Sequence, residues 1–162
     1  MRSSQTGATL VELVITIVII SVAIAGVVGA FSLITGRSAD PLNQTRAVKL
    51  AQLYMDEILT QKYDDQTPQG GFPKFSGSCS IGPDGEGRTT FDDVDDYDGL
   101  SGAPSTATGS ALTGYSGFAI SIAVTCAGTE VGLPSEEAKR IDLDITAPGN
   151  QTFSFTAYRA NF

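Results

Sequence analysis

The side chains of this chain that could carry chemistry are carboxylates and two cysteines. The sequence holds 18 Asp and Glu against 10 Lys and Arg, and it contains no histidine and no tryptophan. The lack of histidine removes the commonest general base and the commonest zinc ligand. No GxSxG, P-loop or GxGxxG arrangement occurs, so the sequence does not predict an enzyme. The formal net charge of −8, without a basic cluster, argues against direct binding to nucleic acid.

The two cysteines, Cys79 and Cys126, are far apart and outside any CxxC spacing, so neither a zinc site nor a redox motif is predicted. In an exported protein such a pair is most simply a disulfide, and two buried free thiols are the alternative. A bridge closing this loop would stabilise the fold by about 4 kcal/mol in the chain-entropy treatment. The choice depends on whether the N-terminal segment directs export.

The segment Asp84–Gly99 concentrates seven carboxylates and one arginine. One interpretation is a calcium site with Asp93, Asp95 and Asp98 as candidate ligands, because a hard cation takes oxygen ligands from flexible loops. The spacing does not match an EF-hand loop, and no cofactor is otherwise indicated. A carboxylate pair for glycoside hydrolysis lacks any sign of a sugar cleft.

The alternative interpretation is a solvated acidic loop without a metal. In this interpretation Phe91, Val94 and Tyr97 attach the loop to the rest of the domain while the carboxylates face water. Val94 and Tyr97 occupy positions where an EF-hand would need ligands. We therefore expect the solvated loop.

Glu12 is the carboxylate whose position most needs an explanation. It stands directly before Leu13–Ile34, a run without charge that is long enough to span a bilayer as a helix. A carboxylate inside a bilayer costs at least a few kcal/mol and is usually functional and paired. The run is too long for an ordinary secretory signal, and the nearest candidate cleavage site, "GRSAD", places Arg37 where a small residue is needed.

The stretch "TGATLVELVITIVIISVAIAGVVGA" resembles the N-terminus of type IV pilins and pseudopilins. Members of that family have a short polar leader that ends in Gly, followed by an apolar residue, Thr-Leu-x-Glu and a long apolar helix. The resemblance makes Gly7 the last leader residue and Glu12 the fifth mature residue. It implies that a prepilin peptidase cuts after Gly7 on the cytoplasmic side and methylates the amine of Ala8, where the family usually has Phe.

The resemblance gives Glu12 a role in assembly. After cleavage the charged amine of Ala8 lies in apolar surroundings, and Glu12 of a neighbouring subunit can pair with it and relieve the desolvation of both groups. Glu12 would then fix the register of stacked helices. The alternative is a glutamate that reaches the lipid headgroups on its own.

We expect an α+β fold of the type IV pilin kind, in which a long N-terminal helix packs on a small antiparallel sheet. The predicted parts are a leader (1–7), an N-terminal helix (8–62) and a periplasmic or extracellular head (63–162). Within the helix, residues 8–35 would cross the membrane or line a filament core, and residues 40–62 would be amphipathic. Gly36 and Pro41 predict a bend between these halves.

The amphipathic half shows apolar residues near the i, i+3, i+4, i+7 spacing, with charged residues between them. The predicted apolar stripe is Leu42, Val48, Ala51, Tyr54, Met55, Ile58 and Leu59, and the predicted solvated residues are Arg46, Lys49, Asp56 and Glu57. Three later runs alternate with the period of half-buried strands, Phe118–Cys126, Arg140–Thr146 and Gln151–Phe162. Joined by short turns, they predict an antiparallel meander that covers the stripe.

Three further motifs resemble the minor pilins of the mannose-sensitive haemagglutinin (MSHA) pilus system, namely Leu50–Asp65, Gly70–Gly71 and Phe91–Leu100. This implies a low-abundance, non-catalytic subunit that helps to initiate or cap a surface pilus. The expected partners are other pilins, the prepilin peptidase and the inner-membrane assembly platform. The expected location is the inner membrane, with the N-terminus cytoplasmic and the head periplasmic, and then the pilus. The alternatives are a pseudopilin of a type II secretion machine and an adhesive tip subunit that presents the loop Leu100–Gly117.

Overall fold

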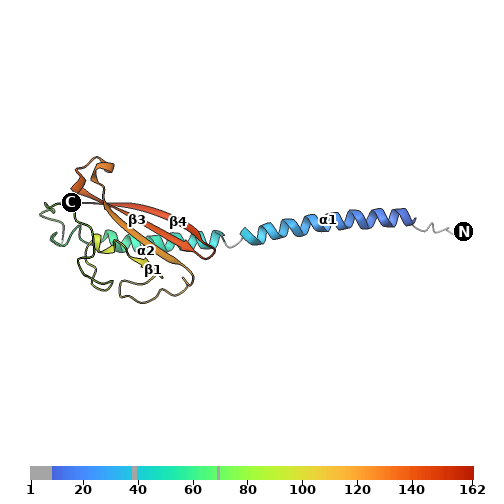
Figure 1. The fold of residues 1–162 in the computed structure, drawn as a ribbon, viewed down its shortest axis with the longest axis horizontal. Coiled ribbons are helices and arrows are strands. Elements are labelled where there is room, and N and C mark those ends of the chain that lie inside the picture. Colours follow the sequence, from blue (N-terminus) through green and yellow to red (C-terminus); the bar gives the residue numbers. More distant parts are fainter. Residues whose placement is uncertain (1–8, 38–39, 69) are drawn as a thin grey trace. The chain divides into compact units, whose positions relative to one another are not determined.

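The computed structural model of the protein describes residues 9–37, 40–68 and 70–162 (Figure 1). The chain divides into two compact units, Met1–Leu42 and Asn43–Phe162. The first unit contains α1 (Leu10–Arg37), and the second contains most of α2 (Asp40–Leu59) together with a four-stranded sheet. The predicted α+β class, with a long N-terminal apolar helix, a second helix and an antiparallel sheet, is confirmed.

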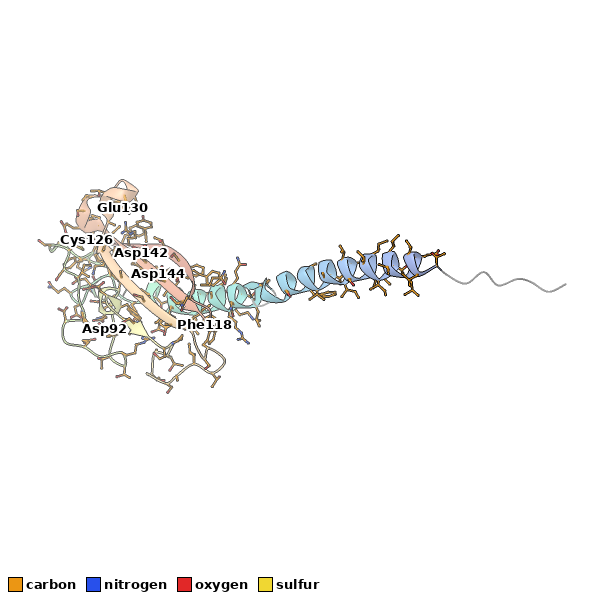
Figure 2. The ribbon with its side chains drawn as sticks, turned by 45° about the vertical axis from the view of Figure 1, so that its right-hand side comes forward. Asp92, Phe118, Cys126, Glu130, Asp142 and Asp144 are labelled. Carbon is orange, nitrogen blue, oxygen red and sulfur yellow. A yellow bond between two sulfur atoms is a disulfide. The ribbon has the colours of Figure 1, made fainter. Side chains whose placement is uncertain are left out.

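The residues of α1 are almost all apolar, and its described hydroxyl side chains form their hydrogen bonds within the helix. The hydroxyls of Thr16, Ser21 and Ser32 donate to the carbonyls four residues earlier, at 2.7, 2.7 and 3.1 Å. Such internal bonds let hydroxyl residues lie in an apolar environment. The span Leu10–Ser32 has a mean hydropathy of 2.8 and is long and apolar enough to cross a membrane. Its side chains project to all sides, and none of this span is buried (Figure 2).

α2 contributes one buried stripe to the core of the second unit. The buried residues are Ala47, Leu50, Ala51, Tyr54 and Ile58, which follow the expected helical spacing. The predicted stripe was partly wrong, because Leu42 and Val48 are 53% and 39% exposed. Met55 and Leu59 lie at its edge and are partly buried.

α2 ends at Leu59. The predicted helix continued to Lys62, but the backbone of Lys62 pairs instead with the acidic segment. Its N–H donates to the carbonyl of Asp92 at 3.3 Å, and its carbonyl accepts from Val94 N–H at 3.1 Å. A long-range backbone pairing therefore replaces the last helical turn.

The sheet has the order β1-β2-β3-β4, and all neighbouring strands are antiparallel. The strands are β1 (Ser101–Gly102), β2 (Ala119–Cys126), β3 (Ala138–Ala147) and β4 (Gln151–Ala160). Strands β2, β3 and β4 form the predicted meander, whereas the short β1 was not predicted. Because side chains alternate along a strand, Ile141, Leu143 and Ile145 of β3 are fully buried, while Asp142 and Asp144 lie on the opposite face (Figure 2).

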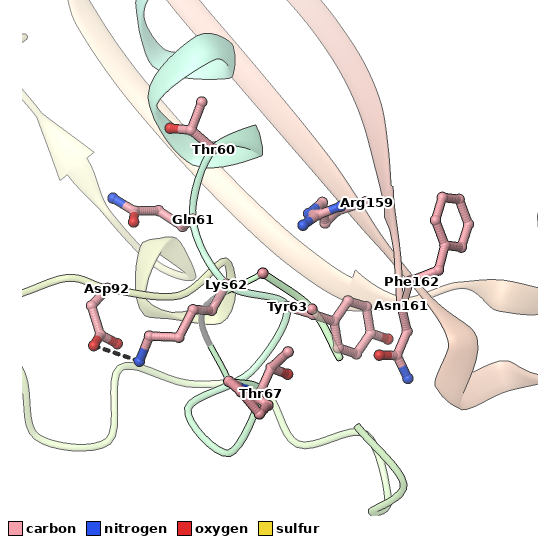
Figure 3. Close-up of a pocket in the computed structure, with 12 residues that line it drawn as sticks. Thr60, Gln61, Lys62, Tyr63, Thr67, Asp92, Arg159, Asn161 and Phe162 are labelled. Atoms are coloured by element: carbon pink, nitrogen blue, oxygen red, sulfur yellow. Dashed lines mark hydrogen bonds and ion pairs between the residues drawn. The ribbon is translucent and has the colours of Figure 1, made fainter. Parts of the chain in front are cut away.

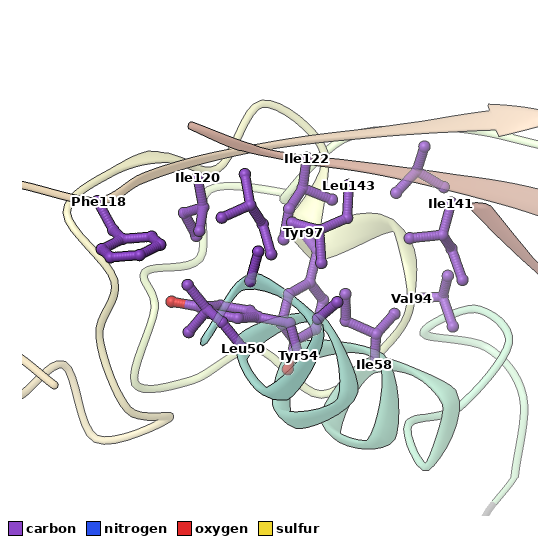
Figure 4. Close-up of a cluster of buried hydrophobic side chains, with 14 of the residues drawn as sticks. Leu50, Tyr54, Ile58, Val94, Tyr97, Phe118, Ile120, Ile122, Ile141 and Leu143 are labelled. Atoms are coloured by element: carbon purple, nitrogen blue, oxygen red, sulfur yellow. The ribbon is translucent and has the colours of Figure 1, made fainter. Parts of the chain in front are cut away.

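The core fills the space between α2 and the inner face of the sheet (Figure 4). Cross-strand neighbours such as Ile122 and Leu143 supply the sheet side. Val94, Tyr97 and Phe118 close the core from the loops, and all three are nearly inaccessible to water. The hydroxyl of Tyr54 accepts from Ser105 N–H and donates to its carbonyl, both at 2.9 Å, so a buried phenol remains satisfied.

The predicted disulfide between Cys79 and Cys126 is present. It links the loop that follows α2 to the last residue of β2, across a sequence separation of 47 residues. The described part of the chain contains no free cysteine.

Candidate functional site

Glu12 lies in the first turn of α1 and is exposed. Its backbone N–H donates to the hydroxyl of Thr9 at 3.3 Å, so Thr9 caps the helix and Glu12 occupies the third helical position. A Thr followed three residues later by Glu is the sequence of a capping box. A carboxylate in the first turn also interacts favourably with the helix dipole. This local role was missed in the sequence, although the spacing "TLVE" indicates it.

The surroundings of Glu12 are apolar. A shallow hollow of about 300 Å³ is lined by Glu12, Leu13, Thr16 and Ile17. Leu13 and Ile17 are 56% and 55% exposed, so water or lipid covers them unless another chain does. Within the described ranges, no Lys or Arg lies within 4 Å of the Glu12 carboxylate. The arrangement is an unpaired anion on an unpartnered apolar helix.

The predicted processing site lies outside the described residues. Gly7 and Ala8 precede Thr9, where the structural description begins. Cleavage after Gly7 and pairing of the Ala8 amine with Glu12 therefore stay predictions.

The acidic segment is a folded part of the head, and the prediction of a solvated loop was wrong for three of its residues. Asp93, Asp95 and Asp96 are 2%, 2% and 4% exposed. Oδ1 of Asp93 accepts from the N–H groups of Asp95 and Asp96 at 2.9 and 3.2 Å, and Oδ2 of Asp96 accepts from those of Asp92 and Asp93. The carboxylates thus satisfy the backbone of a short turn instead of facing water.

Burial also changes the acidity of this turn. Desolvation, with the neighbouring Asp95 as the next cause, raises the pKa of Asp93 to about 7. Desolvation raises the pKa of Asp95 as well, against the opposing effect of a hydrogen bond from Lys139. Asp93 is therefore a carboxyl group that can hold a proton near neutral pH.

The calcium candidates Asp93, Asp95 and Asp98 do not form one cluster of carboxylate oxygens within the described residues. Asp95 accepts a hydrogen bond from Lys139, and Asp98 accepts from Val124 N–H at 2.9 Å. Asp93 lies near Asp65 and Asp92 instead. These three residues were predicted to share a site only because they are close in the sequence.

Lys139 is fully buried, and the sequence analysis missed it. Its ammonium group contacts the carboxylate of Asp95, donates to the carbonyl of Tyr63 at 2.6 Å and lies 4.7 Å from the centre of the Tyr63 ring. The carboxylate of Asp64 is 3.8 Å away. The period of two was the available signal, because Lys139 has the same parity as the buried Ile141.

Glu57 was predicted to face water, and this was wrong. Its carboxylate binds Arg88 through two contacts, at 2.5 and 2.9 Å, and accepts from the Tyr97 hydroxyl at 2.7 Å. The Arg88 guanidinium lies 5.3 Å from the centre of the Tyr97 ring. The Glu57–Arg88 pair attaches the acidic segment to α2.

Residues 2–28 match the prokaryotic N-terminal methylation motif. The matched residues include the predicted Gly7–Ala8 junction, Glu12 and most of α1. No curated protein and no solved structure matches the chain. The match covers the start of the chain, and the motif is a prepilin signal of the type IV pilin kind.

Proposed function

We propose that this chain is a minor type IV pilin, a non-catalytic structural subunit that helps to initiate or cap assembly of a surface pilus. The observation that carries the proposal is the methylation motif at residues 2–28, which includes much of a helix whose apolar span Leu10–Ser32 is exposed. A helix of this kind needs lipid before assembly and other helices after it. The head needs neither, since its core is closed by its own residues.

The finer assignment to an MSHA-type pilus rests on the sequence motifs around α2 and the acidic segment, which resemble the minor pilin MshD. Two of these motifs lie close together, because Glu57 of Leu50–Asp65 binds Arg88, which precedes Phe91–Leu100. In this proposal the prepilin peptidase cuts after Gly7 and the protein stays in the inner membrane until it assembles. Glu12 then pairs with the N-terminal amine of a neighbouring subunit.

The experiment is a deletion of this chain with two readouts. Deletion of a minor pilin that initiates assembly should reduce the number of pili per cell many-fold, while secretion of folded enzymes continues. Intact-mass measurement of the membrane-extracted protein should show loss of residues 1–7 and gain of one methyl group. A mature chain that begins at Ser38 or Asp40 would contradict the proposal, because it would mean an ordinary secretory signal.

A pseudopilin of a type II secretion machine is the second candidate, because the methylation motif fits it equally well. It predicts the reverse result from the same deletion, namely normal pili and loss of enzyme secretion. The two candidates therefore give opposite results in the same pair of measurements.

A further inference from the structure

A polar cavity of about 390 Å³ lies in the head, where the chain leaves α2 and where β4 ends (Figure 3). Its volume is in the range of sites that hold a small molecule. The lining residues on which the argument depends are Lys62, Thr67, Asp92, Arg159 and Asn161. No part of the proposed assembly role uses this cavity.

Three lining side chains carry buried polar atoms without a hydrogen-bond partner among the described residues, namely Thr67, Arg159 and Asp92, whose Oδ1 can accept from a ligand hydroxyl. Thr67 is 4% exposed, and within the described residues its buried hydroxyl makes no hydrogen bond. The Nε–H of Arg159 is also buried and unpartnered there, while the Nη1 of the same side chain makes only a long bond, at 3.4 Å, to the adjacent carbonyl of Ala160. Leaving such groups unsatisfied costs free energy, which a ligand that bonds to them would recover.

The charges of the lining do not cancel. Lys62 is neutralised by Asp92, whose carboxylate lies 2.6 Å from its ammonium group. Arg159 has no carboxylate within 4 Å among the described residues, although the chain as a whole carries an excess of acid. The cavity therefore offers one uncompensated positive charge.

The wall that carries Arg159 is held rigidly. Asn161, which is 2% exposed, accepts from Phe75 N–H at 3.1 Å and donates to the Phe75 carbonyl at 2.7 Å. Arg159 itself lies in β4, opposite the buried Lys139 of β3. These bonds hold the end of β4 beside Phe75, while the guanidinium itself has only its long bond to the Ala160 carbonyl among the described residues.

We propose that this cavity binds a small hydroxylated carboxylate of the size of one acidic sugar residue. The Arg159 guanidinium takes the carboxylate, for which its planar donors are matched. The Thr67 hydroxyl and the free N–H bonds of Lys62 take hydroxyl oxygens. A dianion such as phosphate is disfavoured, because the lining supplies a single uncompensated charge and the chain repels further negative charge.

The test uses the full-length protein in detergent micelles, with D-galacturonate as the probe. D-galactose is the control without the carboxylate, and propionate is the control without the hydroxyls. Binding is followed through the NMR signal of the Arg159 Nε–H and by calorimetry. We expect galacturonate to bind with a dissociation constant on the order of 1 mM and to shift the Arg159 signal. Both controls should bind at least about 10-fold more weakly.

Three variants locate the site. Arg159→Gln should weaken galacturonate binding by about 10-fold or more, and Thr67→Val by a few-fold. Arg140→Gln, which removes an arginine already paired with Glu130 and Asp142, should leave binding unchanged. Equal binding of galactose and galacturonate, an unaltered Arg159 signal, or no binding at about 50 mM probe would each overturn the proposal. The signal of the wild-type protein decides the question even where a variant fails to fold.

Discussion

At the scale of one residue, Glu12 has a local role in the structure and a proposed role in assembly, and substitutions can distinguish the two. Its position after Thr9 stabilises the start of α1 locally, and its charge on an apolar surface suits a partner from another chain. The local bond observed uses the backbone N–H of Glu12, whereas the proposed assembly role needs the negative charge of the side chain. Substitutions that separate size, hydrogen bonding and charge can therefore separate the roles.

We expect Glu12→Ala to insert in the membrane and to be processed, since a costly carboxylate is removed and Gly7 is untouched. Incorporation into sheared pili should fall strongly, because a neighbour's amine would lose its partner at a cost of about 3 kcal/mol. Incorporation of Glu12→Gln should lie between those of wild type and Glu12→Ala, since its amide keeps a hydrogen-bonding side chain but not the charge. Asp56→Ala removes an exposed carboxylate from α2 and is the control. Normal incorporation of Glu12→Ala at normal protein level would contradict the assembly role.

Asp93 predicts a pH dependence of head stability. In an unfolded chain its pKa is about 4, whereas burial holds it near 7 in the folded protein. Between these values the folded state keeps a proton that the unfolded state has lost, so stability falls as pH rises from about 4 to 7 and is level above that.

Asp93→Asn should remove this fall, because the amide cannot ionise and its oxygen can still accept from Asp95 N–H and Asp96 N–H. The difference in unfolding free energy between variant and wild type should shift in favour of the variant by about 1 kcal/mol or more from pH 4 to pH 8. Urea titrations at several pH values measure the difference, and Asp56→Asn controls for the loss of one acidic charge. Parallel curves for wild type and Asp93→Asn would show that Asp93 is not the titrating group.

At the scale of elements, the connection between β2 and β3 is more ordered than the turn that its sequence predicted. It contains two short 3₁₀ helices, Gly128–Val131 and Ser135–Glu137. Gly128 is required there, because a Cβ would lie 1.8 Å from the carbonyl oxygen of Pro134. The same connection accepts hydrogen bonds from Tyr63 and from the backbone of Asn161.

Gly128→Ala should therefore destabilise the head by about 2 kcal/mol or more, because the backbone of the connection must move to admit a methyl group. Gly87→Ala is the matched control, since its Cβ would meet nothing within 4 Å. Chemical denaturation of both variants measures the difference. Equal denaturation midpoints for Gly128→Ala and wild type would show that the connection admits a methyl group without loss of stability.

The elements with a strong period could be predicted from the sequence, and those set by distant contacts could not. Alternation predicted the ends of β2, β3 and β4 to within two residues, and the uncharged run predicted α1. The face of α2 was misplaced at Leu42 and Val48, because the apolar type of a residue does not tell whether another element covers it. The buried carboxylate of Asp95 pairs with Lys139, far away in the chain, whereas carboxylates close together in a sequence by themselves indicate water.

At the scale of the whole molecule, a single covalent link supplements a modest core. The Cys79–Cys126 bridge closes a loop that contains the whole acidic segment. Reduction should lower the unfolding free energy of the head by about 4 kcal/mol, through the added freedom of the unfolded chain. Denaturant titration with and without reductant measures this. The double variant Cys79→Ser, Cys126→Ser should not respond to reductant, and an unchanged midpoint of the reduced wild type would contradict the expectation.

The core of the second unit has a consequence for what happens to a subunit that leaves a filament. The buried apolar residues of that core all come from residues 47–147 of this chain. If the chain assembles through α1 as proposed, leaving a filament would expose the helix alone and would not unfold the head. A released copy could return to the lipid intact and be used again, so the cell could recycle its supply of this protein without new synthesis.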